Sequence, residues 1–277
     1  MNLDALWHDL ECGAYTEDLA LWRSLAARTG GPVLDVGAGT GRVTLELATC
    51  GVEVVAIDIA APLLAALACR AVGLPVETVV TDARDLRLDK QFSLILVPMQ
   101  TLQLFGGRAG RAAFLRCASK HLKPGALLAA ALADAMDCFD EDRDQPPPPD
   151  AREIFDVRYT SQLLRVVDDR GRAAIHRHRE IVRPRGRSEA HDVVVHLDRV
   201  SADEVATEAR HVGFIPETSL RVPESERYLG STVIVLRRGR SSHSTPATGR
   251  TQRRSVALGS ELGRLTPACT SFASLCT

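Results

Sequence analysis

The chain has 277 residues, of which 45% are hydrophobic, and its formal net charge is −1. That length allows one large or two small domains with a sizeable core. No run of 18 apolar residues occurs, and no basic segment followed by an apolar core stands at the start. We therefore expect neither a membrane span nor a secretory signal.

The seven cysteines form no C-x-x-C pair, and their odd count does not suit a simple disulfide framework. Cys50, Cys69 and Cys117 fall inside apolar helical patterns, where we expect buried free thiols. The number and spacing of the cysteines predict that the protein is located in a reducing cytoplasm.

The first 30 residues are predicted to be helical. Apolar residues recur there at helical spacing at Leu19, Trp22, Leu25 and Ala26. Thr16 is the predicted N-cap, with acids in the first turn. The Gly-Gly-Pro run at 30–32 predicts the end of the helix.

Residues 33–42 are the most informative segment. An apolar strand carries Asp35 and turns on three glycines, Gly37, Gly39 and Gly41, and a helical run follows at once. A strand that stops on glycines and opens a helix brings bare backbone N–H groups up to a ligand. The segment therefore predicts a site for a nucleotide-like cofactor.

The spacing of these glycines argues against a dinucleotide. The dinucleotide fingerprint is G-x-G-x-x-G, whereas this turn is G-x-G-x-G and position 42 is Arg. The carboxylate of Asp35 would repel a pyrophosphate but suits a cationic or amino-bearing ligand. Both features disfavour a nicotinamide oxidoreductase.

Two further predicted strands end in acids. Residues 52–58 end at Asp58, which lies 21 residues after Gly37, and residues 76–82 end at Asp82. An acid at the first position can accept hydrogen bonds from both hydroxyls of a ribose. Asp82 can accept a hydrogen bond from an adenine amino group. A ligand with an amino-acid end, a ribose and an adenine would use all three acids.

These motifs resemble the class I S-adenosylmethionine-dependent methyltransferases over roughly residues 5–238. They occur in the family's order: the glycine turn, Asp58, Asp82 with Ala83, a strand at 92–98, and a strand preceded by residues 121–126. The alternation of strands and helices over 33–133 favours an α/β fold with a parallel sheet. The resemblance implies a doubly wound, Rossmann-like sheet of seven mostly parallel strands, the last one antiparallel, and S-adenosyl-L-methionine as cofactor.

The resemblance also implies the role of each cofactor position. Asp35 and the glycine turn hold the methionine end, and Asp58 binds the ribose. Tyr15 and Trp22 either cover the cofactor or pack in the core. The implied cofactor-binding residues are Tyr15, Trp22, Asp35, Gly37, Ala38, Gly39, Gly41, Asp58, Ile59, Asp82, Ala83, Val97, Pro98 and Met99.

Three strands joined by short turns are predicted over 157–167, 173–183 and 191–200, which form an antiparallel meander. The acidic, proline-rich stretch at 137–152 before them is predicted to be a surface loop. The meander is an insertion over 154–200 that resembles the sheets of glycine and aminosugar N-methyltransferases, where they are lids or dimer surfaces. A homodimer through this insertion is therefore left open.

The chain is expected to resume the family core after the insertion. Ser201 begins a capping box, and its helix is predicted to end at Gly213. Strands are predicted at 214–222 and 231–236. Residues 1–238 are the predicted methyltransferase domain, and 239–277 are a predicted disordered basic tail.

The sequence assigns no catalytic residue. Methyl transfer from a sulfonium is an in-line displacement, which needs alignment and exclusion of water more than a base. His196 is a candidate base or a half-buried polar residue, and Gln100 either orients a substrate or caps the next helix. His176 and His178 share a face without a further ligand nearby, so we predict no metal.

The predicted function is methyl transfer to a nitrogen or oxygen nucleophile of a small molecule. A non-catalytic cofactor-binding member of the fold and a protein methyltransferase are the alternatives. From residue 237 onward there are seven arginines and one acid, so the remaining chain is acidic. An acidic body argues against nucleic acid as a partner.

Overall fold

The computed structural model describes residues 2–133, 138–140, 147–225 and 230–239. All of them belong to one unit, Met1–Ser241. The predicted basic tail lies outside the described residues from position 240 onward. No helix in the described ranges is long and apolar enough to cross a membrane.

The main sheet has the strand order β11-β13-β5-β4-β1-β2-β3, and its first five strands in sequence pair in parallel. These five are β1 (Val33–Val36), β2 (Val54–Asp58), β3 (Val76–Val80), β4 (Phe92–Val97) and β5 (Leu122–Leu132). β13 (Ser231–Arg238) is antiparallel to β5. This arrangement confirms the predicted Rossmann-like class.

The edge of the main sheet differs from the prediction in one detail. The single strand expected over 214–222 is two strands, β11 (Phe214–Pro216) and β12 (Leu220–Val222), which both pair with β13. The ladder continues one step through the N–H of Glu217, which donates to the carbonyl of Val235 at 2.8 Å, before the chain leaves it. The sheet therefore has eight strands in seven positions.

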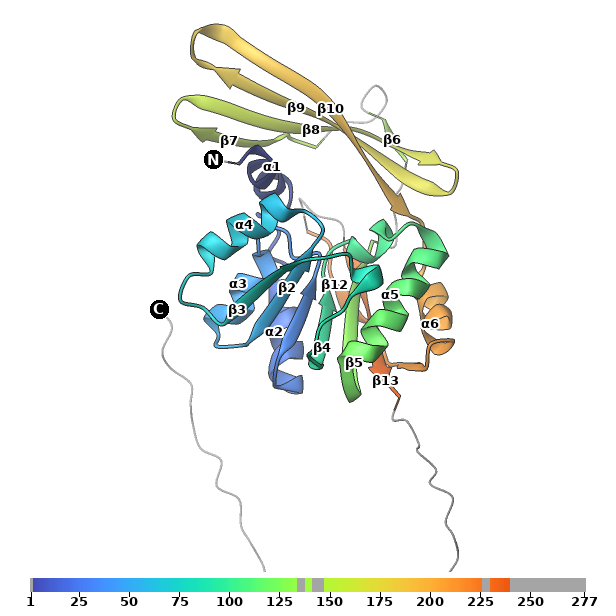
Figure 1. The fold of residues 1–277 in the computed structure, drawn as a ribbon. Coiled ribbons are helices and arrows are strands. Elements are labelled where there is room, and N and C mark those ends of the chain that lie inside the picture. Colours follow the sequence, from blue (N-terminus) through green and yellow to red (C-terminus); the bar gives the residue numbers. More distant parts are fainter. Residues whose placement is uncertain (1, 134–137, 141–146, 226–229, 240–277) are drawn as a thin grey trace, which may run out of the picture. The chain divides into compact units, whose positions relative to one another are not determined.

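Helices cover both faces of the main sheet (Figure 1). α5 (Gly107–His121) and α6 (Ala202–Arg210) pack on the face that carries Leu34, Val55 and Ile95. α2 (Leu19–Thr29), α3 (Arg42–Thr49) and α4 (Ala61–Arg70) pack on the other face. The buried strand residues are almost all aliphatic, as expected for a parallel sheet that is covered on both sides.

The N-terminal segment is two helices, not one. α1 (Leu3–Cys12) and α2 are separated by residues 13–18. The predicted N-cap Thr16 is therefore wrong. Asp18 occupies the N-cap position of α2, but its carboxylate accepts hydrogen bonds from Trp22 and Arg42 instead of capping the helix. The predicted end is confirmed, since Gly30 follows α2 with a φ of 61°.

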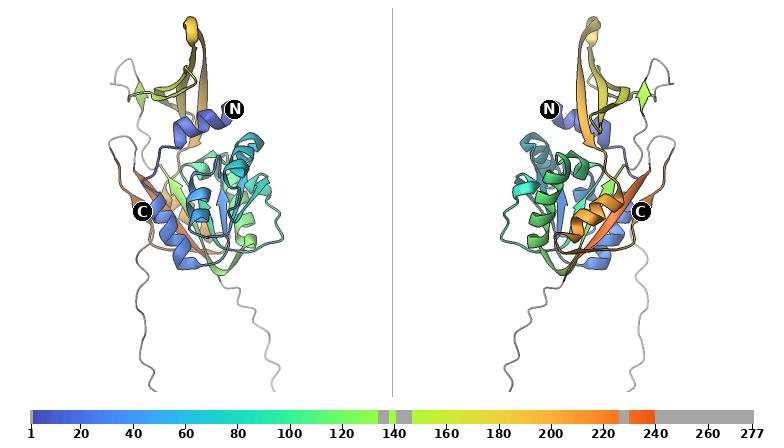
Figure 2. Two further views of the ribbon diagram at one scale, coloured as in Figure 1. Left: turned by 90° about the vertical axis from the view of Figure 1, so that its left-hand side faces the viewer. Right: turned by 90° about the vertical axis from the view of Figure 1, so that its right-hand side faces the viewer.

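A second, antiparallel sheet has the strand order β10-β9-β8-β6, and β7 also pairs with β8. Its long strands β8 (Val157–Asp169), β9 (Arg172–Arg183) and β10 (Arg187–Asp198) are the predicted meander. β6 (Phe139–Asp140) and the first three residues of β7 (Asp150–Ile154) lie in the segment that was predicted to be a loop. Figures 1 and 2 show α1 between this second sheet and the main sheet.

Short helices and turns complete the elements. The 3-10 helices are η1 (Ala83–Asp85), η2 (Thr101–Leu104) and η3 (Pro184–Gly186). The predicted capping box of α6 is present between Ser201 and Glu204, but α6 ends three residues before Gly213. Cys50 and Cys69 are exposed, contrary to expectation, because Leu47, Leu64 and Leu67 take the buried positions of their helices.

Buried polar contacts fix the two ends of the second-sheet insertion. The side-chain amide of Gln103 donates to the carbonyls of Ala133, at 3.3 Å, and Asp198, at 3.0 Å, and its oxygen accepts from the N–H of Ala133 at 3.0 Å. Ala133 follows β5, and Asp198 ends β10. Gln103 therefore holds together the points where the chain leaves and re-enters the main fold.

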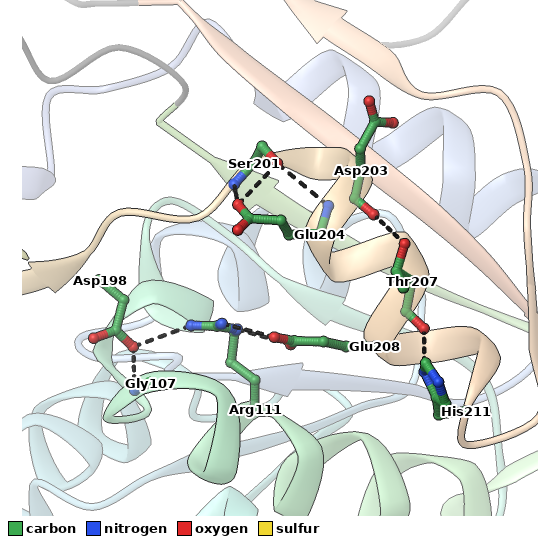
Figure 3. A network of polar contacts seen from close by, with 9 residues as sticks. All are labelled: Gly107, Arg111, Asp198, Ser201, Asp203, Glu204, Thr207, Glu208 and His211. Atoms are coloured by element: carbon green, nitrogen blue, oxygen red, sulfur yellow. Dashed lines mark hydrogen bonds and ion pairs between the residues drawn. The ribbon is translucent and has the colours of Figure 1, made fainter. Parts of the chain in front are cut away.

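Arg111 extends this anchor to α6 (Figure 3). Its guanidinium donates to both carboxylate oxygens of Glu208, at 2.9 and 2.8 Å, and to Asp198 at 3.3 Å. Asp198 also accepts from the N–H of Gly107. The end of β10 is thereby tied to α5 and α6 through groups that lie inside the protein.

Candidate functional site

The glycine turn joins β1 to α3 at the carboxyl edge of the main sheet. Gly37, Gly39 and Gly41 have φ values of 71°, 55° and 98°, a region that side chains disfavour. Space is also short: a Cβ on Gly37 would lie 2.5 Å from the Thr101 Cγ2, and one on Gly39 2.3 Å from the His8 Nε2. Both backbone shape and close approach therefore require glycine.

Asp58 ends β2 directly beside this turn. One carboxylate oxygen accepts from the N–H of Gly39 and the other from the N–H of Ala60, both at 2.9 Å. Each oxygen keeps a second acceptor site. Asp58 therefore braces the turn and still has capacity to bind hydroxyl donors; the bracing role was not predicted from the sequence.

Ile59 follows Asp58 and is 73% exposed. A large apolar side chain so open beside a polar turn offers a surface on which an aromatic ring can pack. Its position agrees with the adenine contact that the sequence resemblance implies.

Asp35 lies under the glycine turn and is 1% exposed. One carboxylate oxygen accepts from the Thr44 hydroxyl at 2.6 Å, and the other is buried without a hydrogen-bond partner. Burial raises the pKa of Asp35 to about 6. An ionised carboxylate with one unpartnered oxygen is a suitable site for an ammonium or another cation.

The raised pKa of Asp35 makes the ligand-free protein less stable as the pH rises. Its carboxyl keeps its proton in the folded state between pH 3.8 and about 6, where the unfolded chain has lost it. The free energy of unfolding of the native protein, relative to Asp35→Asn, should therefore fall by on the order of 2 kcal/mol between pH 4 and pH 7.

Urea unfolding of both proteins across this pH range measures the difference. Asp85→Asn, which changes an exposed carboxylate, is the control. The difference in free energy of unfolding between this variant and the native protein should not change with pH. If the difference for Asp35→Asn is also independent of pH, Asp35 does not have a raised pKa in the folded protein.

Asp82 follows β3, and its carboxylate already has a partner within the protein, Arg84. Its carboxylate accepts from the backbone N–H of Arg84 at 2.8 Å and forms an ion pair with the guanidinium at 2.6 Å. These bonds from Arg84 lower the pKa of Asp82. No sequence pattern pointed to Arg84, whose guanidinium also donates to the carbonyl of Phe105. Ala83 is buried beside Asp82.

The end of β4 lies next to β1 in the sheet, which brings its following residues to the same edge. Val97 and Pro98 are buried, whereas Met99 is half-buried and has a φ of 54°. Gln100 takes the N-cap position of η2, but its side chain makes no capping hydrogen bond.

Trp22 and Tyr15 take the packing role that the sequence left open. Trp22 is 0% exposed, and its indole N–H donates to Asp18 at 2.7 Å. Tyr15 packs in the same cluster, with the guanidinium of Arg42 5.0 Å from its ring. Trp22 has no surface open to a ligand, so we remove it from the cofactor positions.

The structure favours the interpretation of His196 as a half-buried polar residue. Residues alternate between the faces of β10, and Val193 pairs with Arg177, whose side chain points toward α1. His196 therefore lies on the opposite face, where its Nε2 is 3.1 Å from the Asp169 carboxylate. A base aimed at the strand ends is inconsistent with this position. In the described part of the chain, no group of three or more His, Cys, Asp or Glu side chains could hold a metal.

The contacts of α1 with the rest of the protein were not predicted from the sequence. On one side, Asp9 accepts from the Thr40 hydroxyl at 2.6 Å and pairs with Arg70. On the other side, Glu11 accepts two hydrogen bonds from Arg179 and one from Ser161, all at 2.7–2.8 Å. The ring of Trp7 packs edge-on against Tyr159. α1 therefore connects the glycine turn to the second sheet.

Two hollows are present, and neither is lined by Asp35, Asp58 or Asp82. One of 470 Å³ is lined by parts of α1, α3, α4 and β7, including Arg70 and Thr40 of the glycine turn itself. Another of 630 Å³ lies beside the end of α5 and the segment that leads into β4. The larger one is at the opposite edge of the sheet from the glycine turn, so volume does not mark the candidate site here.

Comparisons with known proteins agree with this geometry. Residues 33–125 match the model of a family described as a methyltransferase domain. A cypemycin N-terminal methyltransferase of Streptomyces sp is 36% identical over 132 residues, which are 48% of this chain and 50% of that protein. The chain thus spans about half the length of this curated relative.

Solved structures show the same fold at low identity. A sugar N-methyltransferase of Streptoalloteichus sp aligns with a TM-score of 0.68 at 17% identity, covering 86% of this chain and 93% of that one. An amino pentose methyltransferase of Micromonospora aligns with a TM-score of 0.65, also at 17% identity, covering 86% and 97%. Both likenesses extend over 86% of this chain.

Proposed function

Because residues 33–125 match the model of a family described as a methyltransferase domain, we propose that this protein transfers a methyl group from S-adenosyl-L-methionine to a nucleophile of a small molecule. The observation that carries the proposal is the glycine turn braced on Asp58, with the unpartnered oxygen of Asp35 beneath it. An amino-acid end and a ribose are the groups that these two carboxylates suit.

The residues at the strand ends fit the parts of this cofactor. Asp35, Gly37, Ala38, Gly39 and Gly41 would hold the methionine end. Asp58 would bind the ribose, and the exposed Ile59 would pack on the adenine, with Asp82 and Ala83 at its edge. Val97, Pro98 and Met99 would line the space near the sulfur. When bound, the cofactor supplies a methyl group activated by a positively charged sulfur.

The chain itself has to align the nucleophile and exclude water. α1 and the second sheet are in place for this, since α1 contacts the glycine turn on one side and β8 and β9 on the other. With His196 on the far face, no side chain is assigned as a general base. We therefore propose in-line displacement in which the protein contributes position and shielding.

A nitrogen acceptor is favoured over an oxygen acceptor. The relatives whose names state an acceptor include methyltransferases of an N-terminus and of a sugar nitrogen. The 36% identical relative favours a peptide α-amine as a second candidate acceptor. The domain bounds 1–238, a homodimer through the second sheet and a cytoplasmic location stay predictions.

Calorimetry tests the cofactor first. S-adenosylmethionine and S-adenosylhomocysteine should bind, whereas NAD should not. Labelled donor is then offered with an amino sugar, a peptide with a free N-terminus, and each compound with its amine replaced by a hydroxyl. Transfer to the amine forms alone supports the nitrogen assignment. Failure of both sulfur nucleotides to bind would overturn the proposed function, and binding without transfer to any acceptor would favour the non-catalytic alternative.

A further inference from the structure

His8 of α1 lies directly on the glycine turn. Its Nε2 is 2.3 Å from the position where a Cβ on Gly39 would stand, so the imidazole rests against the bare α-carbon of that glycine. His8 is half-buried, so part of the residue remains accessible. His8 therefore reaches the cofactor edge from outside the main sheet.

Hydrogen bonds fix which ring nitrogen of His8 carries the proton. The single hydroxyl hydrogen of Thr40 is donated to Asp9 at 2.6 Å, and the same hydroxyl oxygen lies 3.1 Å from the His8 Nδ1. Thr40 can only accept from His8, so Nδ1 bears the hydrogen. Arg70 pairs with Asp9 at 2.5 Å and holds this carboxylate in place. The Nε2 is left as an acceptor.

The charge state of His8 agrees with this tautomer. Burial is the largest influence and lowers the pKa of His8 below its usual value. Asp9, Asp58 and Glu11 oppose this effect, and Arg42 adds to it. The ring is consequently neutral at pH 7, and Nε2 keeps its lone pair.

We propose that His8 is a further cofactor-binding residue whose Nε2 accepts a hydrogen bond from a ribose hydroxyl of the methyl donor. Gly39 stands between the two acceptors, because its α-carbon lies against His8 and its N–H donates to Asp58. A vicinal diol provides two donor hydroxyls for two such acceptors. The inference rests on the proposed function, since it takes the ribose of that cofactor as the ligand.

This role places α1 in cofactor binding together with the second sheet. The helix that carries His8 also carries Glu11, which is held by Arg179 and Ser161 of β9 and β8. A purely structural role for His8, in which it only packs α1 onto the turn, is the alternative. The two roles differ in whether a hydrogen-bond acceptor is needed at Nε2.

The binding of S-adenosylhomocysteine and of its 2′-deoxy and 3′-deoxy analogues, measured by calorimetry at pH 7.5, separates these roles. His8→Phe keeps a ring for packing but removes the acceptor, and it should weaken S-adenosylhomocysteine by about 3- to 10-fold. His8→Gln, whose amide oxygen can replace Nε2, should stay within about twofold. His176→Phe, on the far face of the second sheet, is the matched control and should leave the affinity unchanged.

Together with His8→Phe, the deoxy analogues form a double-mutant cycle that measures the coupling between His8 and a ribose hydroxyl. In the native protein, one of them should bind about 3- to 10-fold more weakly than S-adenosylhomocysteine, and this penalty should disappear in His8→Phe. If both analogues carry the same penalty in the native protein and in His8→Phe, the inference is overturned. If the native protein does not bind S-adenosylhomocysteine at all, the proposed function fails instead.

Discussion

Replacing Arg111 by methionine should lower the free energy of unfolding by about 3–5 kcal/mol. The Arg111 side chain is 7% exposed and pairs with two buried carboxylates, Glu208 and Asp198. Methionine keeps most of the volume but leaves both acids uncompensated in the protein interior. Such a loss exceeds that of an ordinary ion pair because the remaining charges cannot reach water.

Urea unfolding followed by circular dichroism measures this loss. Arg87→Met is the matched control, because Arg87 is 83% exposed in its pair with Asp85, and the change should stay within about 0.5 kcal/mol. Adding Glu208→Leu to Arg111→Met should recover part of the stability by removing one of the two unpaired charges. A loss below about 1 kcal/mol for Arg111→Met would contradict the buried network.

The main sheet and the acids at its edge could be predicted because their signals are local. The strand that carries Asp35, the three glycines and the start of α3 are contiguous, and one short segment encodes the turn and its backbone conformation. Asp58 and Ile59 follow the next strand in the same way. In parallel βα units these strand ends meet at one edge, so sequence order was enough to bring Asp35, Asp58 and Asp82 together.

The packing of the second sheet and α1 could not be predicted from local sequence patterns. Alternation along 191–200 predicted a strand and its two faces, but it carries no information on which face points to α1. His196 was therefore left with two interpretations, a base or a half-buried polar residue. The contacts of α1 join Glu11 to Arg179, 168 residues apart. No local periodicity reports such a pair. The break between α1 and α2 at Gly13 was hidden because the apolar spacing on both sides is helical.

Asp58→Asn should weaken the binding of S-adenosylhomocysteine by about 2–3 kcal/mol, or roughly 30- to 150-fold, nearly as much as Asp58→Ala. Both oxygens of Asp58 accept backbone N–H groups, from Gly39 and Ala60. An amide has one oxygen, so its NH₂ would face one of these donors. The turn would lose a brace in addition to the charged acceptor for the ribose.

The two variants together distinguish bracing from direct contact. If Asp58 acted only as a hydroxyl acceptor, Asn would keep part of that function and bind distinctly better than Ala. If Asp58 also braces the turn, the affinities of Asp58→Asn and Asp58→Ala for S-adenosylhomocysteine should differ by less than about threefold. The reason is that an amide hydrogen directed at a backbone N–H is repulsive. Asp82→Asn is the control at the neighbouring strand end: its carboxylate is engaged mainly by Arg84, so the loss should be smaller than for Asp58→Asn. Calorimetry with S-adenosylhomocysteine gives the three affinities, and equal binding by native protein and Asp58→Asn would remove Asp58 from the cofactor site.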